Sequence, residues 1–335
     1  MRNWGGLRSF IRLARPMDFT KPSLDIERQI ELLKSRGLRI EDEQIAKECL
    51  SSISYYRLSG YFLTRYKDPK TEHKFYPDST FQQILDTYIF DRKLRVLFFD
   101  QIEKIEVAFR TRMALHLSLA KGPWWYQDSA FYAKADIQLR DNFCLKLSDN
   151  YTKSKEEFIK AFKAKYRGPL HNLAISKCAD PLPPWWIAVE IMTLPELSRL
   201  YNDLNRKPAT KGNLSLAINQ IAQDFDVVDK RLGSWLKTIS FLRNVCAHHG
   251  RLWNRSNPNQ PSQPNRDPRW LANPIALGDQ GKLYTSASII KYLLDRVAGP
   301  NTFKASLEKL FTDFPTIPKN YMGFPQDWQS EKLWA

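Results

Sequence analysis

Apolar residues recur at spacings of three and four along most of the chain, which is the pattern of amphipathic helices and not of strands. Glycine and proline gather between these segments, where they separate one helix from the next. The pattern predicts an all-α fold with helices near residues 23–36, 41–50, 55–66, 78–120, 136–148, 153–166, 184–205, 211–223, 228–249, 284–297 and 303–313. We expect the helix over 55–66 to be interrupted or bent near Gly60.

The longest segment begins at Asp78 or Ser79, either of which is a suitable N-cap, and contains no glycine or proline before Gly122. One side of it carries the apolar residues that we expect to form the spine of the core: Ile84, Tyr88, Phe98, Ile102, Phe109 and Met113. The expected organisation is a basic N-terminal arm and helical lobe (1–77), a helical core containing this spine (78–300), and a C-terminal helix and tail (301–335).

Composition narrows the class of partner. The chain has 51 Lys+Arg against 36 Asp+Glu, and the resulting net charge of +15 favours a polyanion such as nucleic acid. The cysteines at 49, 144, 178 and 246 lack metal-ligand spacing, so we expect no zinc, no disulfide and no cofactor. No apolar run approaches the roughly 18 to 20 residues of a membrane span. The basic start of the chain also lacks the hydrophobic segment of a signal peptide, so we expect a cytoplasmic protein without a membrane partner.

Candidate chemistry concentrates at the end of the 228–249 helix, in the stretch from Arg243 to Arg255. The buried face of this helix is predicted by an apolar stripe at Leu232, Trp235, Ile239, Leu242 and Cys246. At about 100° per residue, Asn244 and His248 fall one turn apart on the opposite face, with Arg243 at its edge. His249 lies closer to the stripe, which favours a structural place for it. In the alternative interpretation, the cations of this stretch only cap the helix by interacting with its dipole.

The pattern Arg243-Asn-x-x-x-His248 resembles the Arg-x(4–6)-His signature of HEPN ribonucleases, in which the residue after arginine is typically Asn, His or Asp. The longer stretch, Arg-Asn-x-Cys-Ala-His-His-x-Arg-x-Trp-Asn-Arg, resembles the Abi family of bacterial abortive-infection proteins, of the AbiD and AbiF kind. Three further segments carry the same resemblance, at residues 21–61, 91–112 and 184–197.

This resemblance implies a HEPN-like helical bundle with additional N-terminal helices, and metal-independent RNA cleavage. In that reaction the 2′-hydroxyl attacks the adjacent phosphate and leaves a 2′,3′-cyclic phosphate and a 5′-hydroxyl. His248 would transfer a proton, Arg243 would bind phosphate oxygens, and Asn244 would orient His248 or the phosphate. The implied flanking phosphate contacts are His249, Arg251 and Arg255. The resemblance also implies a homodimer that brings two motifs together, and a toxin restrained by a small structured RNA antitoxin.

Other clusters have both structural and RNA-binding interpretations. Arg110 and His116 fit the motif spacing, but His116 falls on the apolar side of its helix and Glu106 is placed to pair with Arg110, so we favour a structural interpretation. An aromatic–arginine cluster could stack on unpaired RNA bases or pack between helices: Tyr55, Tyr56 and Arg57. We interpret the pairs Trp124-Trp125 and Trp185-Trp186 as packing anchors, and the six basic residues of 153–167 as a solvated face or a phosphate-facing surface.

The function favoured by these observations is an endoribonuclease toxin of a phage-defence or toxin–antitoxin system. The alternative is a non-catalytic RNA-binding module that uses the same basic end only to grip phosphate. A toxin linked to nucleotidyl or phosphate transfer has less support, because the chain contains no glycine-rich phosphate loop.

Overall fold

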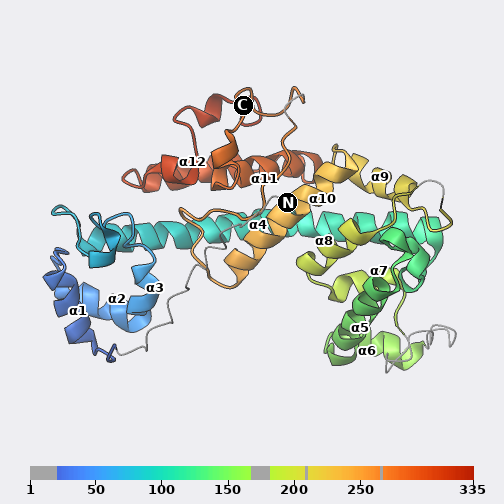
Figure 1. The fold of residues 1–335 in the computed structure, drawn as a ribbon, viewed down its shortest axis with the longest axis horizontal. Helices are drawn as coiled ribbons and strands as arrows, with labels where there is room; N and C mark the ends of the chain where they lie inside the picture. Colours follow the sequence, from blue (N-terminus) through green and yellow to red (C-terminus); the bar gives the residue numbers. More distant parts are fainter. Residues whose placement is uncertain (1–20, 167–181, 208–209, 265–266) are drawn as a thin grey trace, which may run out of the picture. The chain divides into compact units, whose positions relative to one another are not determined.

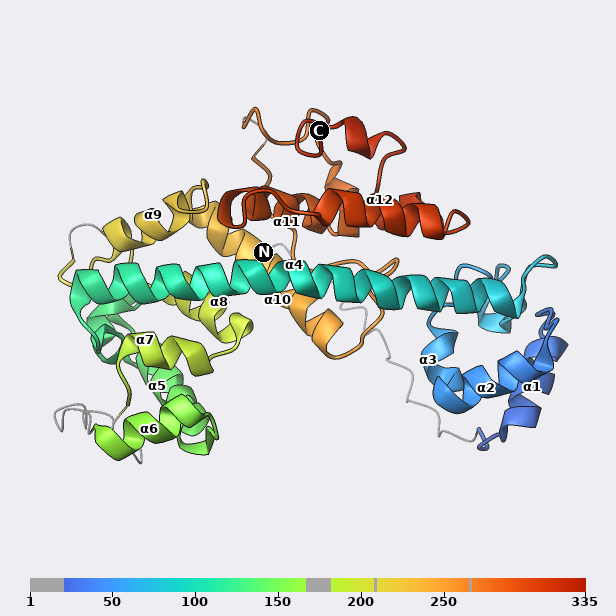
Figure 2. The same ribbon diagram turned by 180° about the vertical axis from the view of Figure 1, so that it is seen from behind.

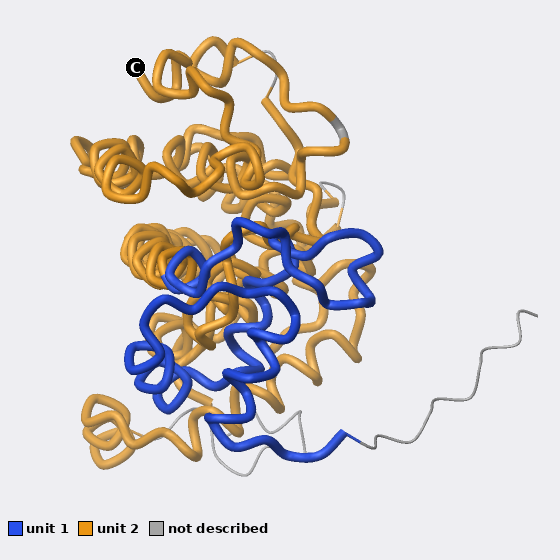
Figure 3. The backbone as a smooth tube through the Cα atoms, turned by 90° about the vertical axis from the view of Figure 1, so that its left-hand side faces the viewer, with its two compact units in different colours: residues 1–85 blue, residues 86–335 orange. Residues whose placement is uncertain are grey.

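The structure is a computed structural model that describes residues 21–166, 182–207, 210–264 and 267–335. Helices dominate these ranges, which contain isolated β-bridges but no β-sheet (Figure 1; Figure 2 gives the reverse view). The all-α prediction is confirmed. The chain divides into two compact units, Met1–Leu85 and Asp86–Ala335 (Figure 3).

The first unit contains three short helices: α1 (Ile26–Ser35), α2 (Glu43–Ser52) and α3 (Tyr55–Ser59). Each begins at a polar N-cap whose side-chain oxygen accepts a hydrogen bond from a backbone N–H of the first turn: Asp25, Asp42 and Ser54. The segment 55–66 is interrupted near Gly60, as predicted, because α3 ends at Ser59 and the chain turns after it. This turn lets Phe62 and Tyr66 both pack on Phe75, with ring centroids 5.5 and 4.7 Å from it.

Helix α4 (Phe81–Lys121) is the 41-residue segment predicted as the spine. Its N-cap is neither Asp78 nor Ser79 but Thr80, whose Oγ1 accepts from the Gln83 backbone N–H at 3.2 Å while Gln83 Oε1 accepts from the Thr80 N–H at 3.1 Å. This reciprocal capping box satisfies two backbone donors at once, which explains why it is preferred to a single cap. Gly122 ends the helix in the left-handed region, at φ 83°.

The core of the second unit is built along α4. Ile84, at the end of the first unit, is buried, and so is every spine residue of the second unit except Tyr88, which is half-buried. The C-terminal helices lie alongside it, and Phe90 stacks on Phe311 at 6.0 Å while Phe98 contacts Phe303 at 5.5 Å. The remaining α-helices are α5 (Ile137–Lys153), α6 (Glu157–Lys165), α7 (Trp185–Ala188), α8 (Leu194–Asp203), α9 (Ser215–Gln223), α10 (Asp229–Ala247), α11 (Leu283–Val297) and α12 (Phe303–Asp313).

Short 3₁₀ helices connect several of these elements, at Lys70–Glu72, Trp125–Gln127, Ser129–Phe131, Ala133–Ala135, Val189–Ile191, Leu277–Asp279, Lys319–Met322 and Trp328–Ser330. One of them breaks the helix predicted over 184–205 into α7, a 3₁₀ turn at Val189–Ile191, and α8. Pro195 lies in the first turn of α8, where its missing N–H costs nothing, and Glu196 caps the Thr193 backbone N–H at 2.7 Å. The break frees backbone carbonyls that a continuous helix would have used internally.

One tryptophan of each predicted anchor pair is in the core. Trp125 and Trp185 are buried with ring centroids 5.1 Å apart, and Trp185 Nε1 donates to the Met113 carbonyl at 2.9 Å. Trp186 is half exposed, so the anchor interpretation is wrong for that residue. Among the described cysteines, Cys49, Cys144 and Cys246 are free thiols, and Cys178 lies outside the described residues. Over the same described ranges, every helix is too short or too polar to cross a bilayer.

Candidate functional site

Helix α10 presents the predicted apolar stripe to the core. All five stripe residues are buried, so the opposite face carries the polar residues of the motif. Cys246 belongs to the stripe, and burial, with the nearby Asp91 carboxylate, raises the pKa of its thiol to about 12. The thiol is therefore protonated at neutral pH.

The motif histidines lie at the end of α10, in a turn that reverses the chain. The helix ends at Ala247, before the predicted stop at Gly250. His249 donates its backbone N–H to the Cys246 carbonyl, and Gly250 donates to the Val245 carbonyl, which together form a Schellman motif. The left-handed position of this motif is occupied by His249, at φ 56°, instead of glycine. The backbone therefore fixes where both imidazoles leave the helix: His248 is exposed at the C-cap and His249 is exposed beyond it.

Arg243 faces helix α4 and shares a carboxylate with Arg110. Its Nε lies 3.5 Å from Glu106 Oε2, and its guanidinium carbon lies 5.9 Å from the ring centroid of Phe99. Glu106 also pairs with Arg110, as its spacing predicted, and Arg110 in turn donates to the Val189 carbonyl that the break before α8 leaves available. The Glu106 side chain is only 12% exposed, so both guanidiniums are held by a nearly dry carboxylate.

This cluster opens into a cavity of about 780 Å³, which we call the cationic cleft. Its lining residues come from α4, the α5–α6 connection, the α7–α8 connection and α10: Arg110, Asn150, Lys153, Ser154, Lys155, Glu156, Phe158, Glu190, Ile191, Met192, Thr193 and Arg243. Four cations and two carboxylates line the cleft, while Glu106 pairs with both arginines and Asp149 pairs with Lys153. The cleft therefore offers an anionic ligand several guanidinium and ammonium donors, without a large net positive charge. The sequence identified Lys153, Lys155 and Arg110 separately, but it contained no signal that they gather around Arg243.

The three motif residues do not share one face. Asn244 and His248 are one turn apart, and the His248 backbone N–H bonds to the Asn244 carbonyl. His248 follows Arg243 by five residues, about 7.5 Å along the axis and well round the helix. Accordingly, Arg243 lines the cationic cleft and His248 does not. His249 lines a different cavity, of about 590 Å³, beside Val96 and Phe99.

A buried carboxylate from α4 holds the turn after the histidines. Asp91 is fully buried, accepts from the backbone N–H groups of Leu252 (3.0 Å) and Trp253 (2.6 Å), and pairs with Arg95. The side chains of Leu252 and Trp253 are themselves buried. The predicted phosphate contacts flank this anchored turn: Arg255 is exposed, Arg251 is half-buried, and Arg255 Nε donates to the Arg251 carbonyl at 2.6 Å.

Arg110 and His116 have different partners. His116 Nε2 lies 2.9 Å from Asp224 Oδ2, and Arg112 Nε lies at the same distance from that oxygen. This ion-pair network ties α4 to the end of α9, in agreement with the structural interpretation of His116.

The aromatic–arginine cluster of the first unit is divided between packing and solvent. The Tyr55 hydroxyl accepts from Arg36 at 2.6 Å, so this ring is engaged within the unit. Tyr56 is 88% exposed and Arg57 is also exposed. Of the three, Tyr56 has the ring face best able to stack on a ligand.

The family model described as Abi-like protein matches residues 48–254, and the chain belongs to that family. Membership suggests a role in abortive infection. Comparison with curated proteins and with solved structures finds no match. The match includes Asp91 and Glu106 of α4 and the whole of α10. Within the described residues, no three His, Cys, Asp or Glu side chains form a group able to hold a metal ion.

We expect Asp91→Ala to destabilise the second unit by about 3–5 kcal/mol, because it leaves Arg95 buried without its carboxylate and two backbone N–H groups without an acceptor. Urea denaturation gives the free energy, and hydrogen exchange should show lost protection at Leu252 and Trp253. Glu103→Ala is the control, since Glu103 is an exposed carboxylate on the same helix and its loss should change stability by no more than about 0.5 kcal/mol. Unchanged protection in Asp91→Ala would contradict the anchoring role.

We expect His249→Gly to be more stable than His249→Ala by about 1 kcal/mol. Both variants lose the imidazole and differ only in the Cβ, which the left-handed conformation at position 249 disfavours. The order should reverse at His248, where φ is −92° and glycine only adds freedom to the unfolded chain. Chemical denaturation of the four variants measures both differences. Equal stabilities for the two His249 variants would mean that the turn is not fixed as described.

Proposed function

We propose that this Abi-like protein is a HEPN-type endoribonuclease that acts in abortive infection or as the toxin of a toxin–antitoxin pair. Support comes from the motif of α10, the net charge of +15 and the cationic cleft on which Arg243 opens. RNA is the anionic partner that matches both the cleft and the residues of the motif.

The proposed reaction is an internal transesterification that needs no metal ion. A base takes the proton of the 2′-hydroxyl, the 2′-oxygen attacks the phosphorus, and the bond to the 5′-oxygen breaks. An acid returns a proton to that oxygen, which leaves a 2′,3′-cyclic phosphate and a 5′-hydroxyl. His248 performs one of these transfers, Arg243 stabilises the charge on the phosphate, and Asn244 orients the imidazole or the phosphate. Arg251 and Arg255 hold flanking phosphates, with His249 beside them.

The observation that carries this proposal is the state of Arg243. Its Nε is buried and has no hydrogen-bond partner among the described residues, while its guanidinium lies over Phe99 and beside Glu106. A guanidinium held in this way is oriented before substrate arrives, so little side-chain freedom is lost when its remaining N–H groups bind phosphate.

One chain supplies one such histidine, whereas the reaction needs a proton acceptor and a proton donor. A twofold dimer that brings the α10 ends of two protomers together would supply both. The exposure of His248 at the C-cap leaves it accessible to a second copy. A structured small RNA, attracted by the same basic surface, is the antitoxin in this proposal.

A non-catalytic RNA-binding module is the second candidate, and one observation favours it. The cationic cleft contains four cations but no histidine, so it can grip phosphate without a proton-transfer group. The two candidates differ in chemistry and not in ligand, and a cleavage assay separates them.

We expect His248→Ala to lower the rate of RNA cleavage by about 10²- to 10⁴-fold, and Arg243→Ala by about 10²- to 10³-fold. His248 is exposed, so its variant should keep the wild-type fold and bind RNA within a few-fold of wild type. The rates are measured on single-stranded RNA with a chelator present.

His116→Ala is the matched control for this assay, because His116 pairs with Asp224 and is not part of the proposed site. It should cleave at close to the wild-type rate. If His248→Ala and Arg243→Ala both cleave at that rate, the ribonuclease proposal is wrong. If the wild-type protein binds RNA but cleaves none, the binding module is the correct function.

We expect a homodimer in solution by light scattering, and a composite site that needs both protomers. After subunit exchange in an equal mixture of wild type and His248→Ala, activity should fall to about a quarter, since only wild-type pairs are complete. A fall of the cleavage activity to one half would show that each protomer acts alone. An active monomer would contradict the composite site.

A further inference from the structure

A second cavity lies between α5 and α8, next to the cationic cleft, and the reaction proposed above does not use it. Its volume is about 280 Å³, just below the roughly 300–1,000 Å³ of small-molecule pockets, so it accommodates one small ring system. Its walls are apolar and aromatic, formed by Tyr132, Leu139, Phe143, Leu147, Met192 and Leu200. We call it the α5–α8 pocket.

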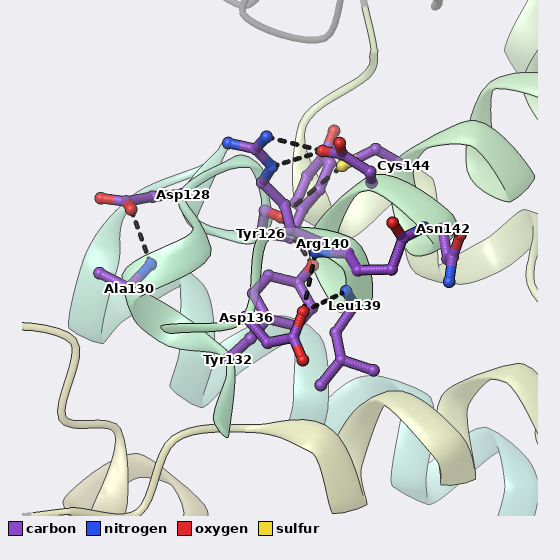
Figure 4. Close-up of polar contacts among 11 residues, drawn as sticks. Tyr126, Asp128, Ala130, Tyr132, Asp136, Leu139, Arg140, Asn142 and Cys144 are labelled. Atoms are coloured by element: carbon purple, nitrogen blue, oxygen red, sulfur yellow. Dashed lines mark hydrogen bonds and ion pairs between the residues drawn. The ribbon is translucent and has the colours of Figure 1, made fainter. Parts of the chain in front are cut away.

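The wall of this pocket is fixed by contacts within the protein (Figure 4). Tyr132 is buried, and its hydroxyl donates to the Tyr126 carbonyl at 2.7 Å, which leaves the ring without a free polar group. Asp136 caps α5 by accepting from the backbone N–H groups of Gln138 and Leu139. The Phe143 ring lies 6.4 Å from that of Tyr132. A flat ligand can therefore pack on surfaces that are already ordered.

The rim of the pocket combines donors, acceptors and both signs of charge: Asn142, Lys146, Asn150, Glu196, Arg199 and Asp203. Burial raises the pKa of the Asp203 carboxyl, although cations including Arg199 oppose the shift. A nucleobase has the matching chemistry, since its faces are apolar and its edge carries hydrogen-bond donors and acceptors side by side.

The pocket and the cationic cleft share a wall. Asn150 and Met192 line both cavities, and Asn150 Nδ2 lies 3.4 Å from Glu196 Oε1 and 3.5 Å from the Ile191 carbonyl. In single-stranded RNA, each sugar between two phosphates carries one unpaired base. A strand with a phosphate in the cleft can therefore extend a neighbouring base towards the pocket.

We propose that the α5–α8 pocket binds one unpaired nucleobase of an RNA strand whose phosphates lie in the cationic cleft. The proposal rests on the proposed function only in taking RNA as the ligand. The pocket confers a base preference on binding, because the rim can satisfy the edge of some bases and not of others. A free nucleotide has the same chemistry and is the other source of such a base.

The test measures binding, so that it does not depend on cleavage. His248→Ala protein is titrated with four single-stranded RNA decamers that differ in one central base, and fluorescence anisotropy reports Kd at physiological salt. The best and worst bases should differ by about fivefold or more. Adding Leu139→Trp, which fills the pocket with an indole, should bring all four Kd values within about twofold of one another.

Leu145→Trp is the matched control, because Leu145 is equally half-buried on α5 but does not line the pocket, and it should keep the base preference. Asn142→Ala, at an exposed rim position, should shift the preference without the risk of misfolding. A preference that survives Leu139→Trp in a folded protein, or its absence in the parent, overturns the proposal for RNA. Calorimetry with the four nucleoside 5′-monophosphates then shows whether a free nucleotide binds there instead.

Failure of this proposal is distinguishable from failure of the ribonuclease function. RNA cleavage without a base preference would support the ribonuclease proposal and contradict the proposal for the pocket. A base preference that Leu139→Trp abolishes, in a protein that cleaves no RNA, would support the proposal for the pocket and contradict the ribonuclease proposal.

Discussion

The shared carboxylate of Glu106 is the interaction on which the candidate site depends. It lies in the middle of α4, is almost dry, and holds Arg110 and Arg243 from two helices that are far apart in sequence. A carboxylate in such a place is stable only with its cations, because an unpaired buried charge costs several kcal/mol. This requirement favours the approach of Arg243 on α10 to α4. It also leaves two guanidiniums facing one cleft, an arrangement that repulsion between them would otherwise disfavour.

A second carboxylate of α4, Asp91, binds backbone N–H groups, whereas Glu106 binds side-chain cations. Asp91 accepts two N–H groups of the turn after the histidines, which would otherwise be buried without partners. The segments 91–112, 184–197 and 243–255, which are separate in the sequence, therefore meet at one helix. Their joint presence in the region matched by the Abi-like family has a physical reason, since each supplies a partner that another one needs.

The break between α7 and α8 links this framework to the cavities around it. Because the chain leaves the helical path at Val189–Ile191, the Val189 carbonyl is available to Arg110, and Ile191 to Thr193 line the cationic cleft. Met192, from the same break, also closes one side of the α5–α8 pocket. A continuous helix would have satisfied these carbonyls internally.

The sequence determined the helices and most of their faces, because apolar spacing depends only on the helical period and on the need to bury one side. The α4 spine, the α10 stripe and the Glu106–Arg110 pair were predictable from residues three or four apart. Residue types also identified Arg243, Asn244 and His248 as candidates. Only the tertiary structure decided what those residues face. That Arg243 meets Glu106, that Lys153 and Lys155 share its cleft, and that His248 lies outside it depend on how helices cross and where α7 breaks, and local periodicity carries no information about either.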